Sequence, residues 1–483
     1  MNTILVLIDT LRRDHLGCYG NPWIQTPNFD RFAARSTVFE QAYIGSYPCM
    51  PARRDLWTGR MEFPFRGWGP LEPAETEIAG LTKAAGRTSM LITDHFHLWE
   101  RGSGNYHFAF SGVEFIRGQE NDNWITDPTL PIPYPAAPEK LAKHARPGSW
   151  ERYCRNTAHF GAEEDYFAPQ VFGKAVEWVE RNRSEQDFFL MLDCFDPHEP
   201  FDPPERYREL YMQNYTGERV IWPTYGRCTL SPEELAYVRA MYAAEVTMVD
   251  HWFGRLLDKV EELGLDKNTA IIVATDHGHM FGEHGIMGKP GSHLGDSNLY
   301  HELAHVPLMI YLPGAEPRRV NGLVQLVDLF PTMCELMNLP VPDGIQGRSL
   351  MPVLTEGRVP DREIAMYGRF GEAINVTDGE WTLFLWPPGE ANTPLYWYST
   401  QPPQFGKVRA TGPMEPSPQG YRYPVDVARG PSRSALYHLP SDPGQNTNLY
   451  DREPGQVARL VGALKQHLHA IDAPPEIAER LGI

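Results

Sequence analysis

Carboxylates and imidazoles follow four apolar runs of the sequence, and together they could hold a metal ion. The runs are TILVLID, TSMLIT, DFFLMLD and TAIIVATD. The residues at or just after their ends are Asp9; Asp94, His95 and His97; Asp196 and His198; and Asp276, His277 and His279. Carboxylate oxygens with an imidazole suit Ca²⁺, Mg²⁺ or Mn²⁺ better than a soft metal. These residue types therefore predict a divalent metal site.

The elements that carry these residues must bring them to one place. The four runs and a fifth, VPLMIYLP, are short and rich in aliphatic residues, as buried strands of a largely parallel sheet are. Helical segments alternate with them, and one opens at Ser231 with Pro232 and Glu234 in capping positions and closes at Gly264. This alternation predicts an α/β fold with a large, mostly parallel but mixed sheet flanked by helices. Chemistry collects beyond the carboxyl ends of such strands.

The length of 483 residues predicts more than one structural unit. We expect a catalytic α/β domain over residues 1–362 and a C-terminal α+β subdomain over residues 363–483. The second part contains short strand-like pieces and a final helix near residues 456–471, which predict a small antiparallel sheet with a terminal helix. Residues 101–161, rich in Gly, Pro and aromatic side chains, are expected to form long loops over one end of the main sheet.

Composition restricts the classes of partner. The chain has 62 Asp and Glu against 44 Lys and Arg, a net charge of −18, which disfavours nucleic acid and anionic membranes as partners. The first apolar run is too short to span a bilayer and lacks the flanks of a signal peptide, so we expect a cytoplasmic protein. Six dispersed cysteines without a CxxC pair predict neither disulfides nor a thiolate zinc site. Whether the chain forms a homo-oligomer stays open.

One cysteine, Cys49, lies in an unusual stretch, SYPCMPARRDLWTGR. Pro51 is suited to the start of a helix and Gly59 to its end, so Cys49 is expected just before a helix N-terminus. That position stabilises an anion. An unmodified sulfur, however, fits a hard cation poorly, because such a cation prefers oxygen ligands.

A family resemblance removes this conflict. Cys49-Met50-Pro51-Ala52-Arg53 with Thr58-Gly59-Arg60 resembles the Cys-x-Pro-x-Arg signature of type I sulfatases, in which a formylglycine-generating enzyme transiently binds the chain and converts the cysteine to formylglycine. The blocks that match are ILVLIDTLRRDHLGCYGN, TPNFDRFAARSTVFEQAY, VATDHGHMFGEHGIMGK, LVQLVDLFPTMCELMNLPVPDGIQGRSLMPVL and LYHLPSDPGQNTNLYD. The resemblance implies an alkaline phosphatase/sulfatase-like fold and a hydrated aldehyde whose oxygens bind the metal and attack sulfur or phosphorus.

The resemblance also implies roles for individual residues. The metal ligands are Asp9, residue 49, Asp276 and His277, with Ca²⁺ as the expected ion and Mn²⁺ or Mg²⁺ as alternatives. Arg53 holds the formylglycine, and His97 is the base that collapses the sulfated hemiacetal. His95 or His279, which lie close to His97 in the sequence, could serve instead. His198 and Lys289 grip the sulfate and protonate or stabilise the leaving oxygen.

Three functions follow from these residues. The first is hydrolysis of small sulfate esters of aryl, alkyl or sugar alcohols. Two departures from many sulfatases, Thr10 in place of a second aspartate and His95 in place of lysine, leave a phosphonate monoester or phosphodiester hydrolase as the alternative, with activity on both classes expected. A binding protein whose Cys49 is never converted is the third, and it is disfavoured because every expected ligand is present.

Trp99, Trp124 and Trp150 could stack on an aryl or sugar group or simply pack the loops.

Overall fold

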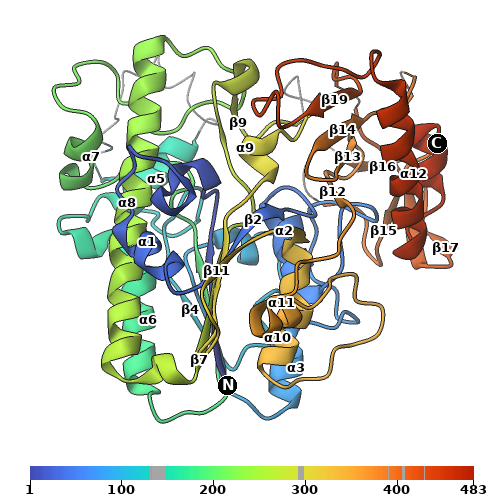
Figure 1. The fold of residues 1–483 in the computed structure, drawn as a ribbon. Coiled ribbons are helices and arrows are strands. Elements are labelled where there is room, and N and C mark those ends of the chain that lie inside the picture. The colour runs from blue at the N-terminus through green and yellow to red at the C-terminus, as the bar shows by residue number, and fades with distance from the viewer. Residues whose placement is uncertain (131, 133–147, 292–297, 390, 405–407, 429) are drawn as a thin grey trace.

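A mixed eight-stranded sheet forms the centre of the molecule. The computed structural model describes all residues except 131, 133–147, 292–297, 390, 405–407 and 429 (Figure 1). β10 is antiparallel to both of its neighbours, and the other pairings in this sheet are parallel. In spatial order the strands are β11 (Arg318–Gln325), β2 (Thr37–Tyr43), β10 (Leu308–Tyr311), β7 (Thr269–Ala274), β1 (Asn2–Ile8), β5 (Phe189–Cys194), β3 (Ser89–Thr93) and β4 (Gly112–Phe115). The predicted α/β fold class is confirmed.

Helices cover both faces of this sheet (Figure 1). On one face lie α1 (Pro27–Ala33), α6 (Phe167–Arg181) and α8 (Pro232–Glu262), with α5 (Ser149–Thr157) and α7 (Glu205–Tyr211). On the other face lie α2 (Cys49–Thr58), α3 (Ile78–Ala84), α10 (Leu329–Leu336) and α11 (Met351–Glu356). Each face has its own buried apolar cluster, as expected for a sheet covered on both sides.

The register of the central strands explains why the predicted site residues meet. Ile8 at the end of β1 pairs with Cys194 at the end of β5, and Leu7 pairs with Ala274 at the end of β7. Because these three strands are parallel, the residues that follow them leave the sheet at the same edge. The N-terminus lies at the lower edge in Figure 1, so the carboxyl ends point upwards.

The long helix α8 follows its predicted signals. The Ser231 side chain accepts a hydrogen bond from the Glu234 backbone N–H, and the Glu234 side chain accepts from the Ser231 backbone N–H. Pro232 is the first helical residue, and Gly264, with φ +68°, follows the end of the helix. These signals fix both ends of a helix that covers the sheet next to β1.

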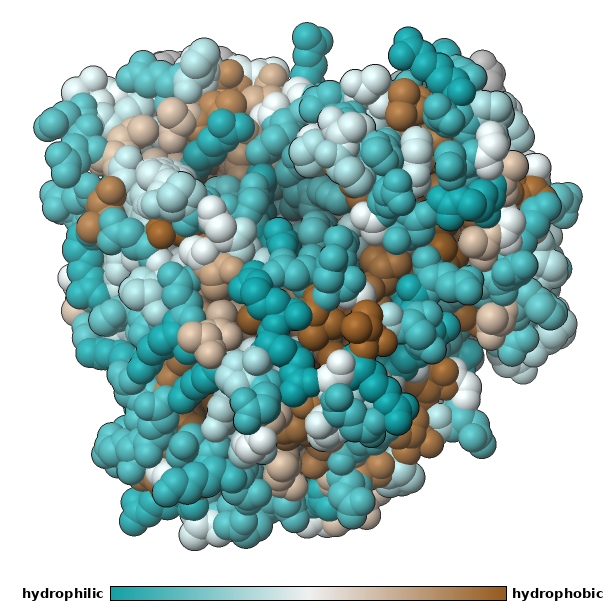
Figure 2. All heavy atoms as spheres, viewed as in Figure 1, coloured by the Kyte–Doolittle hydropathy of each residue, from teal (hydrophilic) through white to brown (hydrophobic). Residues whose placement is uncertain are grey.

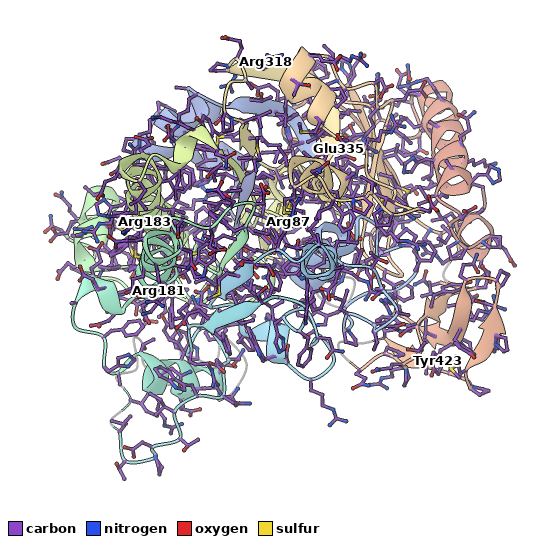
Figure 3. The ribbon with its side chains drawn as sticks, turned by 90° about the horizontal axis from the view of Figure 1, so that it is seen from below. Arg87, Arg181, Arg183, Arg318, Glu335 and Tyr423 are labelled. Carbon is purple, nitrogen blue, oxygen red and sulfur yellow. The ribbon has the colours of Figure 1, made fainter. Side chains whose placement is uncertain are left out.

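The C-terminal part contains small sheets and two helices. One antiparallel sheet consists of β12 (Ala365–Gly368), β13 (Ile374–Thr377), β14 (Trp381–Leu385) and β19 (Ala435–His438), and another of β15 (Tyr396–Tyr398), β16 (Arg409–Ala410), β17 (Glu415–Ser417) and β18 (Gly420–Asp426). The predicted final helix is α12 (Pro454–Ala470), and α13 (Glu476–Leu481) follows it. Seen from below, Tyr423 in β18 and Arg181 at the end of α6 lie at opposite ends of the molecule (Figure 3). The boundary at residue 362 stays a prediction.

Several expectations change in detail. The segment 101–161 contains β4 and α5 as well as loops, and its residues 131 and 133–147 lie outside the described part.

All six cysteines are free, as expected. No helix in the described ranges combines the length and the apolar composition that crossing a membrane requires. The face seen in Figure 2 is largely hydrophilic, with hydrophobic side chains in smaller groups between the polar ones.

Candidate active site

Cys49 is the first residue of α2, whereas the sequence predicts it just before a helix that starts at Pro51. The helix begins two residues earlier than Pro51 suggests, and it ends at Thr58, where Gly59 adopts φ +68°. Cys49 is buried, and this burial together with the Asp9 carboxylate raises the pKa of its thiol well above the ordinary value. An unmodified Cys49 is therefore a neutral thiol and a weak nucleophile.

The four predicted metal ligands meet around Cys49. The ligand atoms of Asp9, Cys49, Asp276 and His277 all lie within 4.8 Å of one another, and the four side chains are buried. The Cys49 Sγ lies 3.2 Å from His277 Nε2. Asp9 follows β1, Asp276 and His277 follow β7, and Cys49 begins α2. The grouping comes from three separate parts of the chain.

Arg53 lies among three buried carboxylates. One turn after Cys49 on α2, its guanidinium makes ion pairs of 2.6 Å to Asp193, 2.6 Å to Asp276 and 3.0 Å to Asp9. Burial would raise the pKa of Asp9, but Arg53 lowers it well below the ordinary value. Burial and the nearby Asp9 raise the pKa of Asp276 to about 6. One guanidinium thus faces three carboxyl groups, and a divalent cation would balance the excess negative charge.

The backbone and side-chain hydrogen bonds leave His277 ready to bind a cation. Its Nδ1 lies 2.8 Å from the Gly278 carbonyl, which only accepts, so Nδ1 carries the proton and the Nε2 lone pair is on the side of Cys49, where a cation could take it. Burial, with Lys289 nearby, lowers the pKa of His277 to about 3, so the ring stays neutral. Thr10, a β-branched residue at φ +63°, donates its N–H to Asp276 Oδ1 at 3.0 Å. A left-handed backbone is strained at a β-branched residue, and such strain persists only where the surrounding structure holds the backbone in place. The two carboxylates and the neutral imidazole therefore fit a hard divalent cation, and residue 49 fits one once an oxygen replaces its sulfur.

A cavity of about 990 Å³ opens over this group. Cys49 lines it together with His97, His198 and Lys289, three of the residues to which the resemblance assigns catalytic roles, whereas Arg53 lies behind Cys49 and does not line the cavity. Trp68, Trp99 and Trp222 add aromatic walls. Further lining residues include Glu100, Arg101, Arg117, Glu120, Asp122, Arg152, Glu199, Pro290 and Arg369. The cavity is large enough for an organic group as well as a tetrahedral anion.

His97 is held between two carboxylates. It lies in the 3-10 helix Phe96–Trp99, its Nδ1 is 2.6 Å from Glu100 Oε2, and its Nε2 is 3.3 Å from Glu120 Oε2. Burial alone would lower the pKa of His97, but Glu100 and Glu120 together raise it above the ordinary value. The ring edge also contacts Trp68, with centroids 4.9 Å apart. The orientation of this imidazole is fixed on three sides.

His198 and Lys289 form a contacting pair. Lys289 follows β9 (Ile286–Gly288), which pairs with β6 (Gly226–Arg227) and β8 (Met280–Phe281), and its Nζ contacts His198 Nε2 and lies 3.5 Å from the Cys49 Sγ. His198 Nδ1 lies 2.7 Å from the Glu199 carbonyl, so Nδ1 is the protonated nitrogen and Nε2 accepts from the ammonium. Burial would lower the pKa of Lys289, but Cys49 and Glu199 raise it, so the side chain stays a cation.

Other histidines and acids near the strand ends lie elsewhere. His95 is fully buried with Nε2 3.3 Å from Asp9 Oδ2, and His279 is fully buried with Nε2 3.3 Å from Glu199 Oε2. Neither lines the cavity, whereas His97 does. Asp94 and Asp196 are buried too, and burial raises the pKa of both. His95 and His279 therefore contact carboxylates of the site and do not face the cavity.

Of the loop tryptophans, only Trp99 lines the cavity. Its ring stacks on Phe115 with centroids 3.9 Å apart. Trp124 is 38% exposed outside the cavity, and Trp150 packs against Trp222. Four further charged residues of the cavity were not predicted from the sequence, namely Glu100, Glu120, Glu199 and Arg369. Glu199 directly follows His198, and Glu100 is three residues from His97, so both spacings were visible signals.

Comparison with known proteins identifies the family. The family model described as Sulfatase matches residues 1–339, well over half of the chain. The chain belongs to the sulfatase family. It is accordingly a sulfuric ester hydrolase with an alkaline phosphatase-like fold, and the family generally uses a metal ion and formylglycine.

Individual relatives agree over most of their length. An arylsulfatase of Clostridium perfringens is 26% identical over 428 residues, 80% of this chain and 85% of that protein. Mouse iduronate 2-sulfatase is 25% identical over 529 residues, 93% of this chain and 91% of that protein. The crystal structure of a phosphonate monoester hydrolase of Agrobacterium radiobacter is similar at a TM-score of 0.68 with 21% identity, covering 98% of this chain and 95% of that one. The last likeness concerns the fold.

Proposed function

We propose that this sulfatase hydrolyses small sulfate monoesters with an oxygen nucleophile made from Cys49. The observation that carries the proposal is the buried group of Asp9, Cys49, Asp276 and His277 at the end of a cavity that His97 also lines. A formylglycine at position 49 replaces the thiol by an aldehyde, whose hydrate supplies the attacking oxygen. Without that change, a buried neutral thiol between carboxylates is a weak nucleophile.

Asp9, Asp276, His277 and residue 49 would hold the cation. Ca²⁺ is the proposed ion because carboxylate oxygens dominate the donor set, and Mn²⁺ and Mg²⁺ are the alternatives. When bound, the ion supplies charge neutralisation and polarises the sulfate oxygens. Arg53 orients the two carboxylates through ion pairs of 3.0 and 2.6 Å and adds a fixed positive charge beside residue 49.

Three side chains handle the protons. His97, with Glu100 on Nδ1, presents Nε2 as the base that takes a proton from residue 49 after the alcohol has left. Lys289 is a cation before the reaction, binds the sulfate and holds the proton that the leaving oxygen needs. His198, whose Nε2 accepts from that ammonium, takes this proton and passes it to the leaving oxygen. Each of these side chains reaches the cavity that Cys49 lines.

A phosphonate monoester or phosphodiester hydrolase is the second candidate. Thr10 occupies a position beside Asp9 where a second carboxylate is common in sulfatases, and its hydroxyl donates to Asp9 Oδ1 at 2.5 Å. The exchange removes one negative charge near the cation. A less acidic site repels any anionic ester less, and a phosphonate monoester, a phosphodiester and a sulfate monoester each carry one negative charge. Sulfate and phosphonate esters are both tetrahedral oxyanions, so activity on both is expected.

Peptide mass spectrometry with paired rate measurements tests the proposal. The chain is coexpressed with a formylglycine-generating enzyme, and the tryptic peptide containing residue 49 is expected about 18 Da lighter than its cysteine form. p-Nitrophenyl sulfate and a phenyl phosphonate ester are then compared, with Cys49→Ala as the control. Turnover that disappears in Cys49→Ala supports the nucleophile, and the ratio of the two rates chooses the substrate class. An unmodified residue 49 in active protein contradicts the proposal.

A further inference from the structure

The carboxylates of the cavity are already engaged. Glu100 and Glu120 both contact His97, at 2.6 and 3.3 Å. Asp122 makes two hydrogen bonds of 2.7 Å with Arg117. Glu199 contacts the hydroxyl of Tyr225 and lies 3.3 Å from the fully buried His279. Each acidic side chain that lines the cavity is thus neutralised or hydrogen-bonded by a side chain of the protein itself.

Three arginines that line the cavity make fewer contacts with charged side chains of the protein than these carboxylates do. Among the residues that the structure describes, Arg101 makes no ion pair, and Arg152 donates only to the Asn121 carbonyl, at 3.0 Å. Arg369 has Glu372 as its nearest carboxylate, at 3.7 Å. Weakly paired guanidiniums facing a cavity are strong binding sites for carboxylates and sulfates, because they can donate two parallel hydrogen bonds to the anion.

Arg369 is also fixed beside the reaction centre. It directly follows β12, and the Gly368 carbonyl accepts a hydrogen bond from the Tyr47 N–H at 3.0 Å, two residues before Cys49. Its Nη1 donates to the Pro290 carbonyl at 3.2 Å, next to Lys289. Its side chain is 28% exposed. These bonds hold a cation near both the nucleophile and the leaving-group pair, on an element that the reaction as proposed does not use.

The charge of the whole molecule makes this local arrangement unusual. With a net charge of −18, the protein repels anions at long range, so a substrate with two negative charges needs local cations to bind. A single sulfate is already served by Lys289, Arg53 and the proposed metal ion. The cavity of about 990 Å³ extends well beyond one sulfate and is lined by three tryptophans. The extra arginines that line this cavity therefore supply more positive charge than a single sulfate requires.

We propose that the alcohol half of the ester carries a second anionic group, a carboxylate or another sulfate, which Arg369 binds. This inference rests on the sulfatase function proposed above and names its substrate class. Arg369 is then a specificity-determining residue that contacts the substrate, and Arg101 and Arg152 strengthen the positive field around the same anion. Esters of neutral alcohols lack this contact.

Paired aryl sulfates test the proposal. We would measure kcat/KM for p-nitrophenyl sulfate, for its ring-carboxylated analogue and for its ring-sulfonated analogue, in wild type and in Arg369→Gln. The substitution is expected to lower kcat/KM about 10-fold or more for at least one charged analogue and less than about threefold for the neutral ester, since one charge-assisted contact is lost. Whichever analogue loses more identifies the preferred anion. Arg369→Lys, which keeps the charge but not the fork, is expected to lie between the two.

Arg358→Gln is the matched control. Arg358 is 68% exposed, pairs with Glu356 and does not line the cavity, so its loss changes the net charge equally without touching the substrate. Equal losses for all three esters in Arg369→Gln, or the same selective loss in Arg358→Gln, would overturn the inference. Wild type that turns over neutral and charged esters equally overturns it while leaving the sulfatase function intact. Wild type that turns over none of them contradicts the proposed function instead.

Discussion

At the scale of single residues, His97 owes its protonation behaviour to Glu100 and Glu120. Glu100 Oε2 lies 2.6 Å from Nδ1, and Glu120 contacts Nε2 at 3.3 Å. Burial lowers the pKa of the imidazole, and the two carboxylates more than reverse this effect. A base must be neutral to act. Because the pKa of His97 is raised, the activity is expected to fall off in acid at a higher pH than it would with a histidine of ordinary pKa.

Glu100→Gln is expected to move that limb to lower pH. The substitution removes a negative charge that stabilises the imidazolium, so the pKa of His97 falls and the neutral base persists to lower pH. At the same time kcat is expected to fall roughly 10-fold, because Nδ1–H loses its charged acceptor and the ring is held less firmly. The measurement is the pH dependence of kcat with p-nitrophenyl sulfate.

Glu114→Gln is the control for this experiment. Glu114 lies in the edge strand β4, is exposed, and lies outside the cavity. The substitution Glu114→Gln changes the net charge by the same amount as Glu100→Gln. The pH profile of this variant is expected to match that of wild type. If Glu100→Gln leaves the acid limb in place, or if Glu114→Gln moves it as far, Glu100 does not set the pKa of the base.

His198→Ala should reveal which step needs a proton. The loss of kcat/KM is expected to be about 10²-fold or more for an alkyl sulfate, whose leaving oxygen must be protonated, and much smaller for p-nitrophenyl sulfate, whose leaving group departs as a stable anion. Lys289 stays charged beside the site and preserves sulfate binding. A loss of equal size for both esters contradicts a proton-donating role for His198 and assigns it to binding alone.

Individual site residues were predictable where a motif or a strand end marked them. Asp9, Asp276 and His277 follow strands whose register brings their ends together, and Cys49 lies in a recognisable signature. Arg369 was not predictable, because it reaches the cavity through a hydrogen bond between β12 and Tyr47, more than 300 positions away in the sequence. No local pattern encodes such a contact. Which histidine faces the cavity was open for the same reason.

At the scale of elements, α2 places Cys49 and Arg53, and Gly59 fixes where it ends. Gly59 has φ +68°, and a Cβ at this position would lie 2.7 Å from Phe330, which is fully buried. Gly59→Ala therefore combines an unfavourable backbone conformation, which costs about 1 kcal/mol, with a steric clash in the core. We expect a clear fall in the melting temperature and reduced activity, because a shift of α2 displaces the nucleophile.

Gly86→Ala separates the two effects. Gly86 has φ +70° after α3, but nothing lies within 4 Å of a Cβ there. This substitution is expected to show the backbone cost alone, with a smaller fall in melting temperature and unchanged kcat. Equal melting temperatures in the two variants would mean that the contact with Phe330 does not hold α2 in place.

The elements themselves were predicted unevenly. The five continuous apolar runs became β1, β3, β5, β7 and β10, because strands buried on both faces read as unbroken hydrophobic segments. β2 and β11 were missed, since each mixes polar and apolar residues, and the four-residue edge strand β4 is too short to show a pattern. Sequence also cannot show that β10 runs antiparallel among parallel neighbours, because direction depends on the connections.

At the scale of the whole molecule, an acidic protein keeps an acidic group at its centre. Asp9, Asp193 and Asp276 are fully buried around the single guanidinium of Arg53, about where the central strands end. Buried charges that exceed their partners lower stability. The bound cation is therefore expected to contribute to the stability of the whole fold as well as to catalysis, because it binds the folded state and not the unfolded chain.

Removing the metal is expected to lower the melting temperature, and more so at higher pH. The pKa of Asp276 is raised from its ordinary 3.8 to about 6 in the fold, so without metal the protonated form is favoured. Its contribution to stability is present in acid and is lost as the pH rises from about 4 through about 6. The cation binds the carboxylate and competes with this proton. Calcium at 100 times its Kd adds about 2.7 kcal/mol to the free energy of unfolding, and its apparent Kd tightens with pH.

The measurement is the calcium-induced shift in melting temperature between pH 5 and 7.5, after treatment with a chelator. Asp276→Asn is expected to reduce the shift and to remove most of its pH dependence. Asp250→Asn is the matched control, because burial raises the pKa of Asp250 to about 7 but its carboxylate accepts hydrogen bonds from Asn28 and Phe29, outside the predicted ligand group. That variant should be less sensitive to pH overall yet keep the full response to calcium. A calcium shift of the same size at both pH values, or one that survives Asp276→Asn, would place the cation elsewhere in the molecule.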